Sequence, residues 1–220
     1  MYIPPDTGRN PMRLPYFSRA QRNAHMTDKS KITPHMLIVC GPSGTGKSTL
    51  LGHLLSHRQT CCLSRSTTTR APRGTEQNGV EYDFVDIETF QKRIENNEFA
   101  EYANVFGNYY GTPHEMIRST VEEKGLDVLF DIDVQGARQL RAQYPGVWCV
   151  LIAPPSFEVL EKRLRSRGTD APEVIERRLN TARQELAQTD LFDFTIVNDV
   201  LDVSCSQICA LYDALRLRNR

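Results

Sequence analysis

Short apolar runs alternate with segments of helical periodicity over most of the chain. The runs 36–40, 127–131 and 148–153 are nearly continuous in hydrophobic residues, which predicts strands that are buried on both faces. Residues 194–197 predict a last strand. Because strands alternate with helices, we expect an α/β fold with a mostly parallel sheet covered by helices on both faces.

Helical periodicity accounts for most of the remaining chain. We expect helices over residues 47–57, 87–97, 113–124, 158–167 and 202–216. Pro113 should lie in the first turn of its helix. Asp170 and Glu173 have capping-box spacing, which predicts a further helix that begins at Asp170. Residues 80–85 alternate as a half-exposed strand does, with Val80, Tyr82 and Phe84 on one face.

Residues 1–34 differ from the rest, since they carry five prolines and several arginines but no sustained apolar period. We interpret them as a disordered leader. An arginine-rich, acid-poor leader is typical of an organellar address. We favour a dispensable tail or a start codon placed too early over that interpretation, because Met26 and Met36 are both plausible starts.

Charge and composition exclude several classes of protein. Lys plus Arg equals Asp plus Glu at 27 each, which gives no support to a non-specific nucleic-acid binder. No apolar run approaches the ~20 residues that span a bilayer, and no secretory signal is evident. The six cysteines form no C-x-x-C pair, which favours structural thiols in a reduced cytoplasm over a zinc site.

A glycine-rich loop follows the first predicted strand. Residues 41–48 read G-P-S-G-T-G-K-S, a full match to G-x-x-x-x-G-K-[ST]. Its backbone N–H groups and the next helix's N-terminus would cradle the phosphates of ATP. Lys47 would reach the β and γ phosphates, and Ser48 would ligate Mg²⁺. The candidate ATP-binding residues here are Gly41, Pro42, Ser43, Gly44, Thr45, Gly46, Lys47, Ser48 and Thr49.

A second predicted strand ends in a carboxylate. Val128-Leu129-Phe130-Asp131 is similar to a Walker-B strand, whose aspartate helps to hold Mg²⁺, often through water. Many strands end in aspartate, so this feature indicates a Mg²⁺ ligand only in combination with the glycine loop. The sequence therefore predicts a Mg²⁺ site between Ser48 and Asp131.

Three further blocks strongly resemble the guanylate kinase family from about Met36 to the C-terminus. They read T-T-R-A-P-R at 68–73, G-N-Y-Y-G-T at 107–112 and D-I-D-V-Q-G at 131–136. The resemblance implies a P-loop three-layer fold with a core (35–65, 113–161 and 182–220), a small GMP-binding insert (66–112) and a helical lid (162–181). It implies transfer of the γ-phosphoryl group of ATP to GMP with Mg²⁺, in line and without a covalent intermediate.

The resemblance also implies roles for single residues. Arg70, Arg73, Tyr82 and Tyr110 would hold the GMP phosphate, as suits a dianion. Glu101 would accept N1–H and N2–H₂ of guanine, with Ser66, Thr112 and Asp133 nearby. In the lid, Arg167 and Arg178 would meet the transferring phosphoryl group, while Arg163 and Asn198 would contact adenine.

Helix geometry favours Arg178 over Arg177 as the lid arginine. Ile175, Leu179, Ala182 and Leu186 form one apolar stripe that Arg178 borders and Arg177 does not. One departure from the family is Arg65, where a small apolar residue is usual, and it could disturb the aim of Ser66.

Two other functions stay open at this point. A kinase for another nucleoside monophosphate is the first, although Glu101 argues against it. A non-catalytic guanylate-kinase-like domain that binds phosphorylated partners is the second, although such domains typically lose the loop lysine that is present here as Lys47. The expected partners are small-molecule substrates, with neither nucleic acid nor a membrane, in a monomer or a homodimer.

Overall fold

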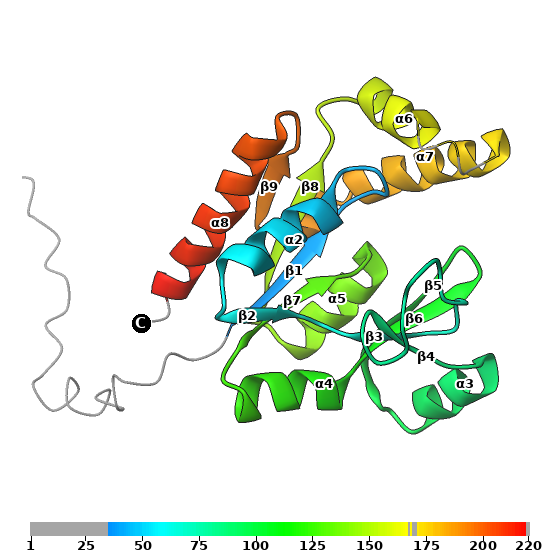
Figure 1. The fold of residues 1–220 in the computed structure, drawn as a ribbon, viewed down its shortest axis with the longest axis vertical. Coiled ribbons are helices and arrows are strands. Elements are labelled where there is room, and N and C mark those ends of the chain that lie inside the picture. Colours follow the sequence, from blue (N-terminus) through cyan, green and yellow to red (C-terminus); the bar gives the residue numbers. More distant parts are fainter. Residues whose placement is uncertain (1–34, 167, 169–170, 219–220) are drawn as a thin grey trace, which may run out of the picture. The chain divides into compact units, whose positions relative to one another are not determined.

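A five-stranded parallel sheet forms the centre of the fold (Figure 1). The computed structural model describes residues 35–166, 168 and 171–218, so the predicted leader, Arg167 and Asp170 lie outside the described residues. The strand order is β2-β7-β1-β8-β9, and every pair is parallel. The strands are β1 (Met36–Cys40), β2 (Cys61–Leu63), β7 (Asp127–Asp131), β8 (Trp148–Ala153) and β9 (Phe194–Val197). This arrangement confirms the predicted parallel sheet.

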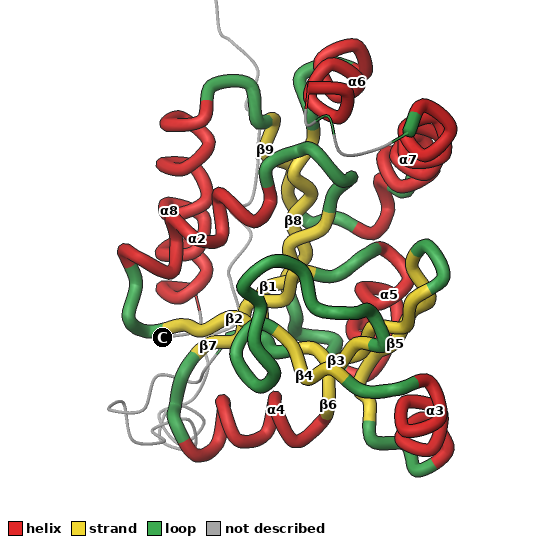
Figure 2. The backbone as a smooth tube through the Cα atoms, turned by 45° about the vertical axis from the view of Figure 1, so that its right-hand side comes forward, coloured by secondary structure: helices red, strands yellow, loops and turns green. Residues whose placement is uncertain are grey.

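Helices cover both faces of this sheet because the side chains of its strands alternate (Figure 2). Leu37 and Val39 pack on one face with α2 (Lys47–His57) and α8 (Leu201–Arg218). Ile38 and Cys40 pack on the other face with α4 (His114–Arg118) and α5 (Val134–Gln143). The predicted three-layer α/β fold is therefore confirmed.

A smaller sheet with the strand order β4-β3-β6-β5 follows the first part of the core. Its strands are β3 (Ser66–Thr68), β4 (Tyr82–Phe84), β5 (Phe99–Val105) and β6 (Asn108–Pro113). Helix α3 (Ile87–Glu95) packs on this sheet through Phe90, whose ring stacks on Phe99 and Tyr109 at centroid distances of 4.5 and 5.3 Å. These elements occupy the segment that we predicted as an insert.

Helices α6 (Phe157–Ser166) and α7 (Pro172–Leu186) pack against each other through a small apolar cluster. Ile175, Leu179 and Ala182 of α7 are buried in it, which confirms the predicted stripe, and Leu186 is half-buried. Two short turns complete the described elements, the π-helix η1 (Ser119–Glu123) and the 3-10 helix η2 (Thr189–Leu191).

Three local predictions were wrong. Val80 lies in a turn after Gly79 and is 62% exposed, so only Tyr82–Phe84 forms the strand. Pro113 precedes the helix, since it ends β6 paired with Phe99 and is the N-cap of α4. The helix expected from Asp170 begins at Pro172, with Ala171 as its N-cap, because proline suits the first helical position.

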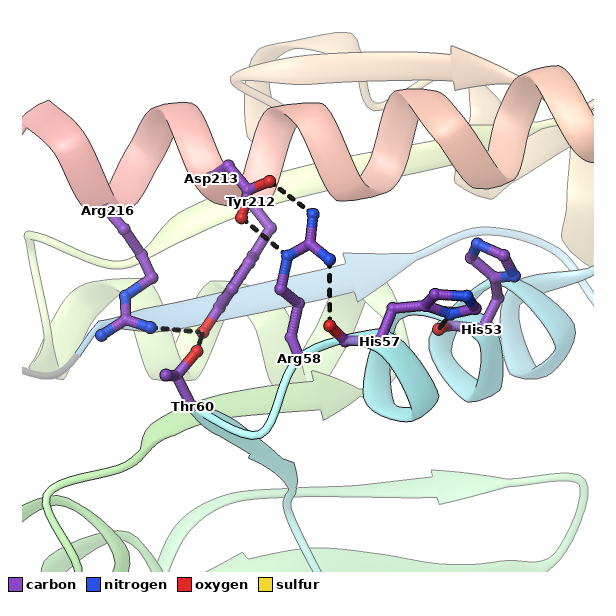
Figure 3. A network of polar contacts seen from close by, with 7 residues as sticks. All are labelled: His53, His57, Arg58, Thr60, Tyr212, Asp213 and Arg216. Atoms are coloured by element: carbon purple, nitrogen blue, oxygen red, sulfur yellow. Dashed lines mark hydrogen bonds and ion pairs between the residues drawn. The ribbon is translucent and has the colours of Figure 1, made fainter.

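Polar contacts fix α8 to the edge of the central sheet (Figure 3). The Tyr212 hydroxyl donates to the buried carboxylate of Asp127 at 2.6 Å and lies 2.8 Å from the Thr60 hydroxyl. Arg58 donates to both oxygens of Asp213. Although α8 is 18 residues long, no helix in the described ranges has the length and apolar character needed to cross a membrane.

Candidate functional site

The glycine loop joins β1 to α2 in the conformation that its sequence requires. Gly41, Gly44 and Gly46 have φ values of 144°, 93° and 93°. A Cβ on Gly46 would lie only 2.4 Å from Asn198 Nδ2, so no larger residue fits there. Gly46 is the N-cap of α2 and no side chain bonds to the helix end there, which leaves the first-turn N–H groups available for phosphate oxygens.

Lys47, Ser48 and Asp131 meet at the carboxyl end of β1 and β7. Lys47 Nζ donates to Gly41 O at 2.5 Å and lies 3.9 Å from Asp131 Oδ1. The Ser48 hydroxyl donates to Asp131 Oδ2 at 3.4 Å. A hydroxyl and a carboxylate at this separation are oxygen donors of the kind that Mg²⁺ prefers, so these residues fit the predicted metal site.

Asn198 holds the glycine loop through a side-chain hydrogen bond. Its side-chain amide donates to Thr45 O at 2.7 Å, and the residue is 5% exposed. Arg163 of α6 donates in turn to Asn198 O at 2.9 Å. The contacts that the structure gives these two residues are with protein groups that shape the loop, while the predicted contacts with adenine stay a prediction.

Arg178 of α7 reaches the glycine loop, whereas Arg177 is exposed. Arg178 Nη1 donates to the Ser43 hydroxyl at 3.3 Å. Arg178 thus has the orientation expected from helix geometry, while its role as the lid arginine stays a prediction. Arg167, the second predicted lid arginine, lies outside the described residues.

A cluster of Arg70, Tyr82 and Tyr110 forms in the small sheet. The Arg70 guanidinium carbon lies 5.3 Å from the centroid of the Tyr82 ring, and the Tyr82 and Tyr110 rings meet edge to face at 6.1 Å. Burial raises the pKa of Tyr82, and the charge of Asp131 adds to that rise. The cluster is thus within electrostatic range of the carboxylate beside Lys47.

Glu76 orients Arg70 in this cluster, and sequence reasoning missed it. The Glu76 carboxylate accepts from Arg70 Nη2 at 2.9 Å and from the backbone N–H of Arg73 at 2.8 Å. The hydrogen bond that Arg70 donates to Glu76 raises the pKa of Arg70 above its usual value. Arg73 itself is exposed, and its backbone N–H reaches the same Glu76 carboxylate.

Glu101 is a buried carboxylate between the small sheet and α5. It is 3% exposed, and its Oε1 accepts from the Thr112 hydroxyl at 2.6 Å. A Cβ on Gly136 would lie 2.3 Å from Glu101 Oε2, so the glycine at this helical position makes room for the carboxylate. Burial raises the pKa of Glu101 to about 7, with a smaller contribution from the charge of Asp133.

Asp133 and Ser66 flank this carboxylate. Asp133 caps α5, because its Oδ1 accepts from the backbone N–H of Gly136 at 2.9 Å. Ser66 is 8% exposed and is paired with Tyr82 in the sheet. Arg65 does not crowd it, since Arg65 donates to Gly79 O and pairs with Asp83 at 3.0 Å.

The predicted residues thus fall into two groups at neighbouring places in the fold. One group surrounds the glycine loop, and the other lines the small sheet and the start of α5. A parallel sheet with a phosphate-cradling loop at the carboxyl end of its first strand defines an α/β nucleotide-binding protein.

Comparisons with known proteins identify the family. The guanylate kinase family profile matches residues 33–215. The chain is 47% identical over 184 residues to a guanylate kinase of Neisseria gonorrhoeae, covering 84% of this chain and 89% of that protein. It is 50% identical over 182 residues to a guanylate kinase of Oleidesulfovibrio alaskensis, covering 83% and 88%. The protein belongs to the guanylate kinase family.

A solved structure agrees with this membership. The crystal structure of guanylate kinase from Anaplasma phagocytophilum superimposes with a TM-score of 0.66 at 32% sequence identity. The superposition covers 84% of this chain and 88% of that one. The family resemblance that the sequence motifs indicated is therefore confirmed.

Proposed function

We propose that this protein is a guanylate kinase that transfers the γ-phosphoryl group of ATP to GMP, giving ADP and GDP. The observation that carries the proposal is the buried Glu101 carboxylate, which lies beside Thr112 in the small sheet of a protein that also has an intact phosphate loop. Relatives of this chain that are 47–50% identical carry the name guanylate kinase.

On the donor side, Lys47 and the N–H groups at the start of α2 bind the ATP phosphates. Ser48 and Asp131 would hold Mg²⁺, Asp131 either directly or through water. When bound, this ion neutralises phosphate charge. Gly41 to Thr49 surround the triphosphate, and Arg163 and Asn198 lie on the adenine side of the loop.

On the acceptor side, Arg70, Arg73, Tyr82 and Tyr110 bind the phosphate of GMP. Glu76 holds the Arg70 guanidinium in place before GMP arrives, which lowers the ordering cost of binding. Arg73 is exposed, and its backbone N–H donates to the same Glu76 carboxylate that holds Arg70. Residues 66–112 form the GMP-binding insert in this proposal.

Glu101 selects guanine. Its ionised carboxylate accepts N1–H and N2–H₂ of guanine together, whereas adenine presents an acceptor at N1. Ser66, Thr112 and Asp133 complete the base site. Because Glu101 is buried, a base that cannot donate to it leaves the charge without partners, which disfavours the wrong nucleotide.

The reaction needs alignment and charge neutralisation more than proton transfer. The attacking oxygen belongs to a phosphate that is already ionised at neutral pH, so no general base is required. Lys47, Arg178 and the predicted lid residue Arg167 stabilise the transferring group. Residues 162–181 form the lid, and closure of lid and insert keeps water away from ATP.

We also propose that the protein works in the cytoplasm on small-molecule substrates, without nucleic acid or membrane as a partner. The balanced charge and six free cysteines support this setting.

The acceptor specificity tests this function. The purified full chain, supplied with ATP and Mg²⁺, should release ADP rapidly with GMP and at least a hundredfold more slowly with AMP, CMP or UMP. Equal rates with AMP would rule out guanine recognition. Absence of ADP with every acceptor would point instead to the non-catalytic binding module.

Lys47→Met tests the donor side. The side chain is 16% exposed and contacts both the loop carbonyl and Asp131, so its loss should lower turnover at least about a hundredfold while GMP still binds. Lys92→Met is the control, because Lys92 lies on α3 and pairs with Glu88 at 2.8 Å. Near-normal turnover in Lys47→Met would refute the assigned role.

A further inference from the structure

Phe106 lies at the tip of the β5–β6 hairpin in an unusual conformation. Its φ is +50° and that of Gly107 is +87°, which is the pattern of a two-residue type I′ turn. Asn, Asp and Gly suit the first position of such a turn, whereas a bulky aromatic residue is a genuine outlier. Phe106 is also 56% exposed, so burial does not explain its presence.

The Phe106 ring lies beside the guanidinium of Arg178, the predicted lid arginine. The guanidinium carbon of Arg178 lies 5.8 Å from the ring centroid, and in Figure 1 the β5–β6 hairpin reaches toward α7. Arg178 also donates to the Ser43 hydroxyl of the glycine loop. The Arg178 guanidinium, which belongs to α7, thus contacts both the β5–β6 hairpin of the small sheet and the phosphate loop.

The contact has the chemistry to hold Arg178. A guanidinium over an aromatic face is attracted by the ring quadrupole, and the attraction grows as water is excluded. The ring offers no hydrogen-bond acceptor that would compete with phosphate for the guanidinium N–H groups. An aromatic face therefore orients the arginine without accepting a hydrogen bond from it.

We infer that Phe106 is a positioning residue that orients the Arg178 guanidinium over the phosphate loop. When the β5–β6 hairpin closes over the site, Phe106 thereby places Arg178. The inference rests on the proposed function, since it assumes that Arg178 acts on the transferring phosphoryl group.

Substitution of Phe106 tests this role in steady-state kinetics. Phe106→Ala should lower kcat for GDP formation by between about 3-fold and 10-fold, with the KM values for ATP and GMP changed less than twofold. Phe106→Asn should lower kcat equally although asparagine suits the turn, so a folding defect cannot be the cause. Phe106→Tyr, which keeps an aromatic face, should restore kcat to within twofold.

A double-mutant cycle with Arg178→Ala separates positioning from other effects. If Phe106 acts through Arg178, Phe106→Ala should have no further effect on kcat in that background. Val203→Ala, which removes a comparably exposed apolar side chain from α8, outside the insert and the lid, is the control and should keep kcat unchanged. Unchanged kcat in Phe106→Ala, or an equal loss with and without Arg178, would overturn the inference. If the wild-type chain itself makes no GDP, the proposed function fails instead.

Discussion

GMP binding should weaken as the pH falls below neutrality, because Glu101 must be ionised to accept hydrogen bonds from guanine. Burial raises the pKa of this carboxyl to about 7 in the nucleotide-free protein, while the Thr112 hydroxyl opposes the rise. Protonation replaces an acceptor with a donor that faces N1–H. The protonated protein is therefore unable to make the paired contact with guanine.

The size of the effect follows from that pKa. If only the ionised form binds, the apparent Kd is multiplied by about 11 at pH 6, by about 2 at pH 7 and by about 1.1 at pH 8. Glu101 should thus account for a loss of affinity of about tenfold between pH 8 and pH 6. The GMP phosphate also titrates near pH 6, which adds a factor of about two at pH 6.

Titration calorimetry with GMP at pH 6, 7 and 8 separates the two contributions when Glu101→Gln is measured alongside. The glutamine variant should bind more weakly at pH 8 and should show only the small dependence that comes from the phosphate. If wild type and variant lose affinity in parallel between pH 8 and pH 6, the carboxyl is not the titrating group and the base assignment is wrong.

Three further outcomes follow from the site. Because the pKa of Glu101 is raised in the folded state, the stability of the wild-type protein falls as the pH rises through about 7. In urea titrations, the gain in unfolding free energy caused by Glu101→Gln should therefore be about 2 to 3 kcal/mol larger at pH 8 than at pH 5. An equal gain at both pH values would contradict this. Gly136→Ala should weaken GMP binding at least about tenfold by calorimetry, although alanine favours helix by about 1 kcal/mol, because its Cβ would meet Glu101 Oε2. Asn198→Ala should raise the KM for ATP about tenfold without changing GMP affinity, since Thr45 O loses its donor; an unchanged KM would show that the loop does not need this support.

Four of the five strands of the central sheet were predictable because they are short apolar runs that no helix pattern explains, whereas the edge strand Cys61–Leu63 was not predicted. Met36–Cys40 runs directly into the glycine loop, so both the strand and the helix that starts at Lys47 had firm boundaries. The small sheet was harder to predict, since Phe99–Val105 is buried unevenly and lacks clean alternation. The turn that begins at Gly79 delays the start of the predicted 80–85 strand to Tyr82, because alternation does not reveal where a turn ends.

The residues of the candidate site also differ in how far the sequence predicts them. Lys47 and Ser48 follow from a motif whose spacing fixes their geometry, whereas Glu101 was reached only through family resemblance. Glu76 left no signal of its own, because it acts through Arg70. Gly136 appeared only as the last residue of the 131–136 block, and its role, which depends on an absent side chain, was not predicted. Contacts between segments distant in sequence decide such roles, and a single sequence does not display them.

Radiolabel transfer tests the central claim most directly. The full chain is incubated with Mg²⁺, GMP and ATP labelled in the γ-phosphoryl group, and the nucleotides are then separated by chromatography. The account predicts that label leaves ATP and appears in the β-phosphate of GDP, with one ADP formed for each GDP. Label that accumulates as inorganic phosphate, with GDP absent, would contradict it.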